Sequence, residues 1–276
     1  SFPTRRSSDL VPGGRVELGG LSSPGTVALN GATSVSFPDG VQPADVSLTN
    51  GSLVDVTSVN GGTIAINSAN FEMSQSTLQA GLTDGAGISN AVAGNITINT
   101  NGNTNLSDRS LIANDIDTLA IGNGGFIQLT TSGLTITGGS RIQTVTNSNG
   151  GSGDIEINAN GAIDISGFTE DGLFSGILTR SAADTSGFGG NITINNAQGS
   201  LNLGNRGFIG TVTDSSSNGG AIAFNLNTLV LDTGGQIITL TTNLGNAGDI
   251  TINASESVTI SGESRDFVPN RLLEDR

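Results

Sequence analysis

The chain of 276 residues contains no cysteine, histidine, tyrosine, tryptophan or lysine. Without Cys and His it has no thiolate or imidazole to ligate a metal, and no disulfide is possible. The same absences exclude a Ser-His-Asp triad, a cysteine nucleophile and a lysine Schiff base. Only carboxylates and arginines remain for ionic chemistry, so we expect no catalytic residue, no bound metal and no cofactor.

Charge and long apolar runs are also scarce. Charged residues make up 12% of the chain, all ten cations are arginine, and the formal net charge is −14. Nucleic acids and anionic membranes are bound by clusters of Lys and Arg, so neither is expected as a partner. No run reaches the roughly 18 apolar residues that a membrane-spanning helix needs, so membrane insertion is not expected.

The sequence instead repeats one short motif. Residues 190–195 (GNITIN) have close copies at 94–99, 153–158 and 248–253, and looser copies at 62–67, 125–130 and 220–225. The first apolar residue of each copy follows the previous one by 28 to 37 residues. A unit that recurs at this period is typical of a solenoid or another repeat array.

Each period holds three short stretches in which apolar and polar residues alternate. In one period the apolar positions are Ile192 and Ile194, then Leu201 and Leu203, then Ile209. Such alternation predicts half-buried strands, whereas a propeller blade needs four strands and a leucine-rich repeat a different leucine spacing. We therefore predict an all-β fold, a right-handed parallel β-helix (solenoid) with three short strands per coil of about 30 residues.

The segments that return the chain to the next coil are rich in Gly, Asn and Ser, as at residues 147–153 and 214–220. These residues adopt positive φ or bond to their own backbone, which suits sharp corners. The longest period carries its extra length between Ile163 and Ile177. We predict a protruding loop there, at residues 167–175.

Four regions follow from the repeat pattern. Residues 1–10 (SFPTRRSSDL) share nothing with the repeats and look like translated adapter sequence, so we interpret them as non-native and exclude them from the fold. We interpret residues 11–60 as irregular β coils that lead into the repeats, 61–262 as the β-helix repeats, and 263–276 as a tail without the pattern. Because no capping element is evident at the last coil, we expect a piece of a longer protein.

The last residue of the motif is Asn in six of seven copies. In stacked coils these side chains would lie about 4.8 Å apart and could bond along the stack, as amide ladders do in cross-β assemblies. The alternative is that Asn only ends a strand. The predicted structural ladder comprises Asn67, Asn99, Asn158, Asn195, Asn225 and Asn253.

The repeats, with residues 13–25 (GGRVELGGLSSPG) and 44–50 (ADVSLTN), resemble bacterial exoproteins of the filamentous haemagglutinin type. These large proteins are secreted by the two-partner route and are also described as S-layer-like β-strand-repeat proteins. The likeness covers about residues 13–262; the Asn-Pro-containing motifs of the family's secretion domain do not precede the coils.

The resemblance implies a non-catalytic structural or adhesive stalk of a secreted or surface-displayed, outer-membrane-associated protein. It also implies an outer-membrane transporter as partner of the parent protein, and surface glycans or proteins of a host or neighbouring cell as adhesion targets.

An alternative function is that of a polysaccharide lyase or hydrolase, since parallel β-helices also host such enzymes on clustered carboxylates. Glu156 and Asp164 alternate with inward isoleucines and so face outward. The same acids could form a calcium or glycan patch, because hard cations take oxygen ligands, or only a solvated acidic surface. The candidate residues are Asp154, Glu156, Asp164, Glu170 and Asp171.

Three arginines, Arg109, Arg141 and Arg206, each precede the third strand of a coil. In a shared register they would line one edge of the solenoid and offer planar forks to acidic sugars or carboxylates. The alternative is that each is a turn residue that shields an edge.

Overall fold

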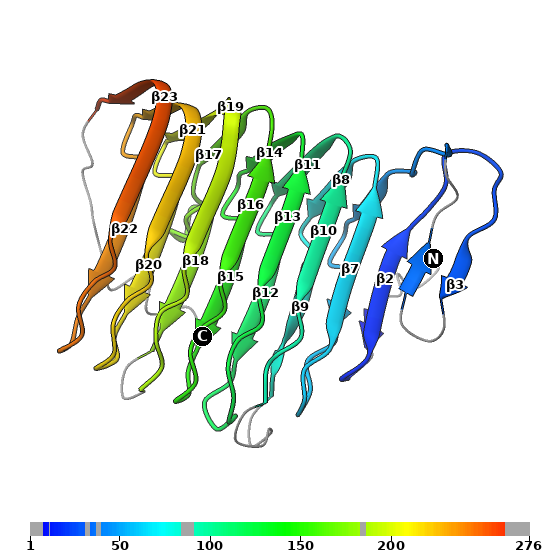
Figure 1. Cartoon of the computed structure of the whole chain (residues 1–276), viewed down its shortest axis with the longest axis horizontal. Helices are drawn as coiled ribbons and strands as arrows, with labels where there is room; N and C mark the ends of the chain where they lie inside the picture. Colours follow the sequence, from blue (N-terminus) through cyan, green and yellow to red (C-terminus); the bar gives the residue numbers. More distant parts are fainter. Residues whose placement is uncertain are drawn as a thin grey trace.

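The computed structural model describes residues 8–10, 12–30, 34–36, 40–83, 91–182 and 186–262. These residues form strands and turns, and parallel strands stack as the coils of a β-solenoid (Figure 1). The predicted all-β parallel β-helix is confirmed. Residues 1–7 and 263–276, which hold most of the adapter-like segment and all of the predicted tail, lie outside the described residues.

Each coil contributes up to three strands, named here in chain order as first, second and third strands. The first strands are β2 (Arg15–Gly19), β7 (Thr63–Ser68), β10 (Ile96–Thr100), β13 (Ile127–Thr131) and β16 (Ile155–Ala159). The second strands are β5 (Val46–Leu48), β8 (Phe71–Ser74), β11 (Asn103–Ser107), β14 (Gly133–Ile136) and β17 (Ile163–Ser166).

The third strands form an 8-stranded sheet, while first and second strands join in a 13-stranded sheet. The third strands are β1 (Ser8–Leu10), β6 (Leu53–Asp55), β9 (Thr77–Leu82), β12 (Leu111–Ile116), β15 (Arg141–Thr146), β18 (Gly176–Ser181), β20 (Phe208–Thr213) and β22 (Gln236–Thr241).

In the last coils the first and second strands run together as one. These long strands are β19 (Ile192–Gly204), β21 (Ile222–Leu231) and β23 (Ile250–Ile260). The register shifts between Asn196 and Ser200, where the chain turns the corner without leaving the sheet. The sequence predicted separate strands here, because a corner that keeps its ladder bonds has no apolar signal of its own.

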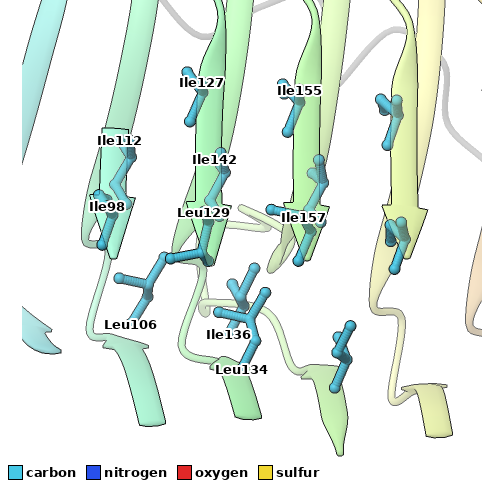
Figure 2. Packing of buried hydrophobic residues seen from close by; sticks show 14 of the residues in the cluster. Ile98, Leu106, Ile112, Ile127, Leu129, Leu134, Ile136, Ile142, Ile155 and Ile157 are labelled. Carbon is cyan, nitrogen blue, oxygen red and sulfur yellow. The ribbon is translucent and has the colours of Figure 1, made fainter. Parts of the chain in front are cut away.

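The apolar residues of successive coils pair in register. The first apolar residue of every copy of the motif is the strand partner of its equivalent one coil along: Ile64, Ile96, Ile127, Ile155, Ile192, Ile222 and Ile250. Figure 2 shows two of them, Ile127 and Ile155, side by side in adjacent coils. All but Ile250, which is 41% exposed, belong to one buried core. Burial of each of the six buried isoleucines contributes about 1.5–3 kcal/mol, so the stack is the main stabilising element.

Residues 11–60 complete a coil of their own. Strands β2, β5 and β6 pair in parallel with β7, β8 and β9, so the predicted irregular coils belong to the solenoid. An antiparallel hairpin of β3 (Ala28–Asn30) and β4 (Ser34–Ser36) interrupts them. Excluding the whole of residues 1–10 from the fold was wrong for Ser8–Leu10, which pairs with β6 because an edge strand offers free backbone groups to any neighbour.

The interior is not wholly apolar. Buried Thr144, Thr179 and Thr211 occupy one inward register of the third strands. Their hydroxyls donate at 2.6–2.7 Å to the carbonyl oxygens of Gly153, Gly190 and Gly220, respectively. These glycines open the next copies of the motif, so each bond fixes the end of a return segment against the third strand before it.

Candidate functional site

The motif asparagines bond along the solenoid axis. Asn195 donates to Asn158 at 3.0 Å, Asn225 to Asn195 at 3.0 Å and Asn253 to Asn225 at 3.1 Å, each from side-chain Nδ2 to Oδ1. Each of these three amides donates to the coil before it, which a ladder explains and strand termination alone does not.

The ladder has a gap. Asn99 donates to Asn67 at 3.3 Å, but its partner on the other side is Thr130, which separates it from Asn158. Asn158 donates instead to Glu156 of its own strand at 3.1 Å. The six predicted asparagines therefore form a pair and a run of four.

The second position of the motif, four residues before the ladder asparagine, holds another set of cross-coil contacts, which the sequence analysis missed. Asp154 Oδ1 accepts the backbone N–H of Asn191 at 2.7 Å, and Asn191 Oδ1 accepts that of Ala221 at 2.9 Å. Asn95 accepts the backbone N–H of Phe126 in the same way, at 3.0 Å. The signal was present as the Asn or Asp that follows the glycine in GNITIN and GDIEIN.

The five candidate acids serve different contacts. Asp154 accepts from Asn191, Glu156 accepts from Gln128 at 3.1 Å, and Asp164 accepts from Asn202 at 2.7 Å. Glu170 and Asp171 lie on the loop at residues 167–175. Throughout the described ranges, no three acidic side chains come close enough together to hold a metal ion. The structure does not gather the five into one cation site, because outward carboxylates on successive strands point to separate amide partners.

The loop at residues 167–175 lies between β17 and β18, where the extra length of its period predicted it. Arg109 forms a bidentate pair with Asp171, at 2.8 and 2.7 Å. Arg206 lies 4.6 Å from the centroid of the Phe168 ring. The two arginines belong to coils on opposite sides of the loop, so they hold it by an ion pair on one side and a cation–π contact on the other.

Only two of the three arginines share a position. Arg141 is the strand partner of Leu111 and Gly176. Its equivalent in the coil of Arg109 is therefore Leu111, two residues after Arg109. Arg109 and Arg206 both occupy the second position of a turn with positive φ, at 65° and 66°. The predicted row of three arginines is therefore wrong, because "just before the third strand" spans both turn and strand.

The turn that holds Arg109 and its equivalent in the next coil adopt a backbone conformation that favours glycine. Asp108 and Arg109 have φ of 55° and 65°, and the turn of the next coil uses Gly138 and Gly139 at 62° and 75°. A Cβ on Gly139 would lie 2.5 Å from Cγ2 of Thr169, so the loop rests directly on this glycine. Non-glycine residues in this region cost about 1 kcal/mol or more each and are tolerated where their side chains have a role.

A cavity of about 560 Å³ opens beside the loop. Its lining comes from the turns of three successive coils and from the loop itself: Gln75, Thr77, Asp108, Arg109, Gly138, Phe168, Thr169 and Glu170. A second hollow of about 270 Å³ lies at the corner between first and second strands and includes Asp164. The larger of these two hollows is the one that the loop at residues 167–175 borders.

The carboxyl of Asp171 is tuned by its contacts. Hydrogen bonds from Arg109 and Thr169 lower the pKa of this exposed group from 3.8 to about 2. It therefore stays ionised, and the loop stays tied to Arg109, at any pH well above that value.

Asp115, on the third-strand sheet, behaves in the opposite way. Desolvation raises the pKa of its carboxyl from 3.8 to about 6, although Gln143 and the backbone N–H of Val145 donate to it at 2.8 and 2.9 Å. The folded chain thus binds this proton more tightly than the unfolded chain, and the group contributes stability below about pH 4 that is lost as pH rises through 6.

We expect Asp115→Asn to raise the free energy of unfolding at pH 7 by up to about 2 kcal/mol, since the amide is uncharged. Its oxygen keeps the bond from the Val145 N–H, and its NH2 group donates to the Gln143 side-chain oxygen once that amide turns over. The gain should shrink as the pH falls toward 4, where the wild-type carboxyl is itself protonated. Urea unfolding of both proteins between pH 4 and 8 measures this. A gain that does not vary with pH would contradict the assignment of the raised pKa to Asp115.

Comparison of the chain with protein-family models, curated proteins and solved structures gives no match. Among the residues that the structure describes, no helix is long and apolar enough to cross a membrane.

Proposed function

We propose that this chain is part of the structural, adhesive stalk of an exported bacterial surface protein. The observation that carries the proposal is the unbroken register of the motif, in which each coil pairs with the next from β2 to β23. Such a stack extends by about 4.8 Å per coil and is rigid because its ladder bonds run along the axis. It holds whatever is attached at one end away from the other.

The side chains of the outer surface support the same proposal. The run of four ladder asparagines and the cross-coil acceptors Asp154 and Asn191 join neighbouring coils by side-chain bonds. A bond of this type contributes about 1 kcal/mol, and each contact in the repeat adds to the interface between neighbours. These polar groups are thereby used for cohesion along the rod.

The carboxylates give little support to the alternative of a glycan-cleaving enzyme. Glycoside hydrolases work with a pair of carboxyl groups that flank the scissile bond. Asp154, Glu156 and Asp164 are instead each bound by an amide of an adjacent coil. We therefore propose that the chain has a non-catalytic role and that its parent protein is exported through an outer-membrane transporter partner.

The test is export of the chain behind a two-partner secretion domain. Residues 8–262 are fused to the secretion domain of a filamentous haemagglutinin-type exoprotein and expressed with and without its outer-membrane transporter. We expect the fusion to be accessible to antibody and protease on intact cells only when the transporter is present. Retention inside the cells with the transporter, or depolymerisation of a polysaccharide by the purified chain, would refute the proposal.

A further inference from the structure

The cavity beside the loop at residues 167–175 has the composition of a saccharide site. Phe168 is 41% exposed and lines the cavity, while Arg206 lies 4.6 Å from its ring centroid. An aromatic ring with free apolar surface packs against the C–H face of a sugar. The positive charge of Arg206 fixes the ring in place, so little conformational entropy is lost when a ligand binds.

Polar groups around the ring offer the other half of sugar recognition. Gln75 provides an amide, Thr77 provides a hydroxyl, and Asp108 and Glu170 provide carboxylates. These groups donate to and accept from vicinal hydroxyls, which are both donors and acceptors. The lining comes from turns of three successive coils, which span about 10 Å at the spacing of stacked strands. This length accommodates one or two pyranose rings.

The charge of the lining selects the kind of sugar. The positive charge of Arg109 is already matched by the bidentate contact with Asp171. Asp108 and Glu170 add two negative charges, and Arg206 beside Phe168 offsets one of them, which leaves a net charge of about −1 around the cavity. An anionic sugar would meet this negative field, whereas a neutral one would meet only hydrogen-bonding groups. The arrangement thus disfavours binding of the acidic sugars that the predicted row of arginines would have favoured.

The site is also held in shape before a ligand arrives. Arg109 and Arg206 fix the loop from both sides, and Ser175 accepts the backbone N–H of Gly139 at 3.0 Å beneath it. Leu173 donates to Thr169 Oγ1 at 2.9 Å within the loop. A preorganised loop of this kind retains more of its gross interaction energy as affinity.

We propose that this cavity binds a neutral hexopyranose unit of a glycan, with Phe168 as the stacking platform and Gln75 as a hydrogen-bonding partner. The inference rests on the proposed function, since it supplies the adhesive stalk with its ligand class. No bond is made or broken, and the site recognises the sugar without acting on it.

The experiment measures binding of methyl glycosides to the purified chain by saturation-transfer NMR and calorimetric titration. The probes are the methyl glycosides of glucose, galactose, mannose and N-acetylglucosamine, with methyl glucuronide as the anionic counterpart. We expect at least one neutral glycoside to bind and the glucuronide to bind more weakly. Phe168→Ala is expected to weaken that binding about tenfold, the effect of losing one aromatic packing contact.

A second variant guards against loss of the loop structure in Phe168→Ala. Gln75 has φ of 52°, so Gln75→Gly removes the amide while keeping the turn, which Gly51 already adopts in the preceding coil. It should weaken binding several-fold with an unchanged melting temperature. Phe188→Ala, at a 63% exposed phenylalanine outside the cavity, is the matched control and should bind as the wild type does.

Three outcomes would overturn the inference: no binding of any neutral glycoside, stronger binding of the glucuronide, or equal binding by Phe168→Ala, Gln75→Gly and Phe188→Ala. Each of these leaves the export experiment unaffected. A chain that is exported but binds no glycoside therefore refutes the saccharide site alone, while a chain that binds and is not exported refutes the stalk alone.

Discussion

Ile194→Asp is expected to unfold its own coil and the coils on both sides. Ile194 is fully buried and pairs in register with Ile157 before it and Phe224 after it. The variant loses about 1.5–3 kcal/mol of apolar burial and places an unpaired charge in the core, which costs several kcal/mol more. The sum is comparable to the whole stability of an ordinary domain, about 5–15 kcal/mol.

The measurement combines thermal unfolding by circular dichroism with limited proteolysis. Because coils contact only their neighbours, new cleavage sites should appear in the returns at residues 147–153 and 214–220, while β7 to β12 stay protected. The matched control is Ala223→Asp, on the outward face of the next coil, where its strand partners are Thr193 and Thr251. Equal melting of the two variants would contradict the inward position of Ile194.

Most of the fold could be predicted because its signal is local and repeated. Ile127, Ile155 and Ile192 each open a recognisable motif, and similar motifs at similar spacing are simplest to satisfy when equivalent residues stack on one another. The loop at residues 167–175 was predicted by the same logic, as the length that one coil has in excess.

The candidate site was less predictable, since its contacts join residues of unequal coils. Arg109 and Asp171 are 62 residues apart and lie at different points of their periods, so no repeat pattern relates them. Arg141 seemed equivalent to Arg109 because both come shortly before the apolar residues of a third strand, but Arg141 is already a strand residue, and the position of Arg109 is filled by Gly139 in the coil of Arg141. Arg109 has a positive φ and Arg141 does not. The sequence does not reveal this difference, because a positive φ is expected of Gly138 and Gly139 but not of Asp108 and Arg109, which fill the same positions in another coil.

The glycine of the motif was predicted as a corner residue, and the structure gives it a different role. The φ of Gly190 lies outside the left-handed region, yet a Cβ there would lie 2.0 Å from the carbonyl oxygen of Gly153 one coil before. The equivalent Gly220 and Gly248 show the same contact, at 1.8 and 2.0 Å to the oxygens of Gly190 and Gly220. The motif needs glycine because stacked coils at about 4.8 Å bring backbone against backbone at this point.

Gly190→Ala is therefore expected to lower the free energy of unfolding by about 2–4 kcal/mol, although it adds a single methyl group. The methyl must displace the Gly153 carbonyl by about 1 Å, since carbon and oxygen do not approach much below 3 Å. That oxygen also accepts the hydroxyl of buried Thr144 at 2.6 Å, so the shift weakens this bond as well.

Gly151→Ala provides the matched control. Gly151 lies in the return segment at residues 147–153, which ends at Gly153, the motif glycine that Gly190 contacts. A Cβ on Gly151 meets its nearest atom, the Phe188 carbonyl oxygen, at 3.6 Å, which is ordinary contact. Alanine there should be neutral or stabilise by about 0.4–1 kcal/mol, because it narrows the unfolded ensemble. Urea unfolding of the two variants separates the explanations: a common loss would indicate that both glycines are needed for flexibility, whereas a loss confined to Gly190→Ala indicates that coil spacing dictates the glycine of the motif.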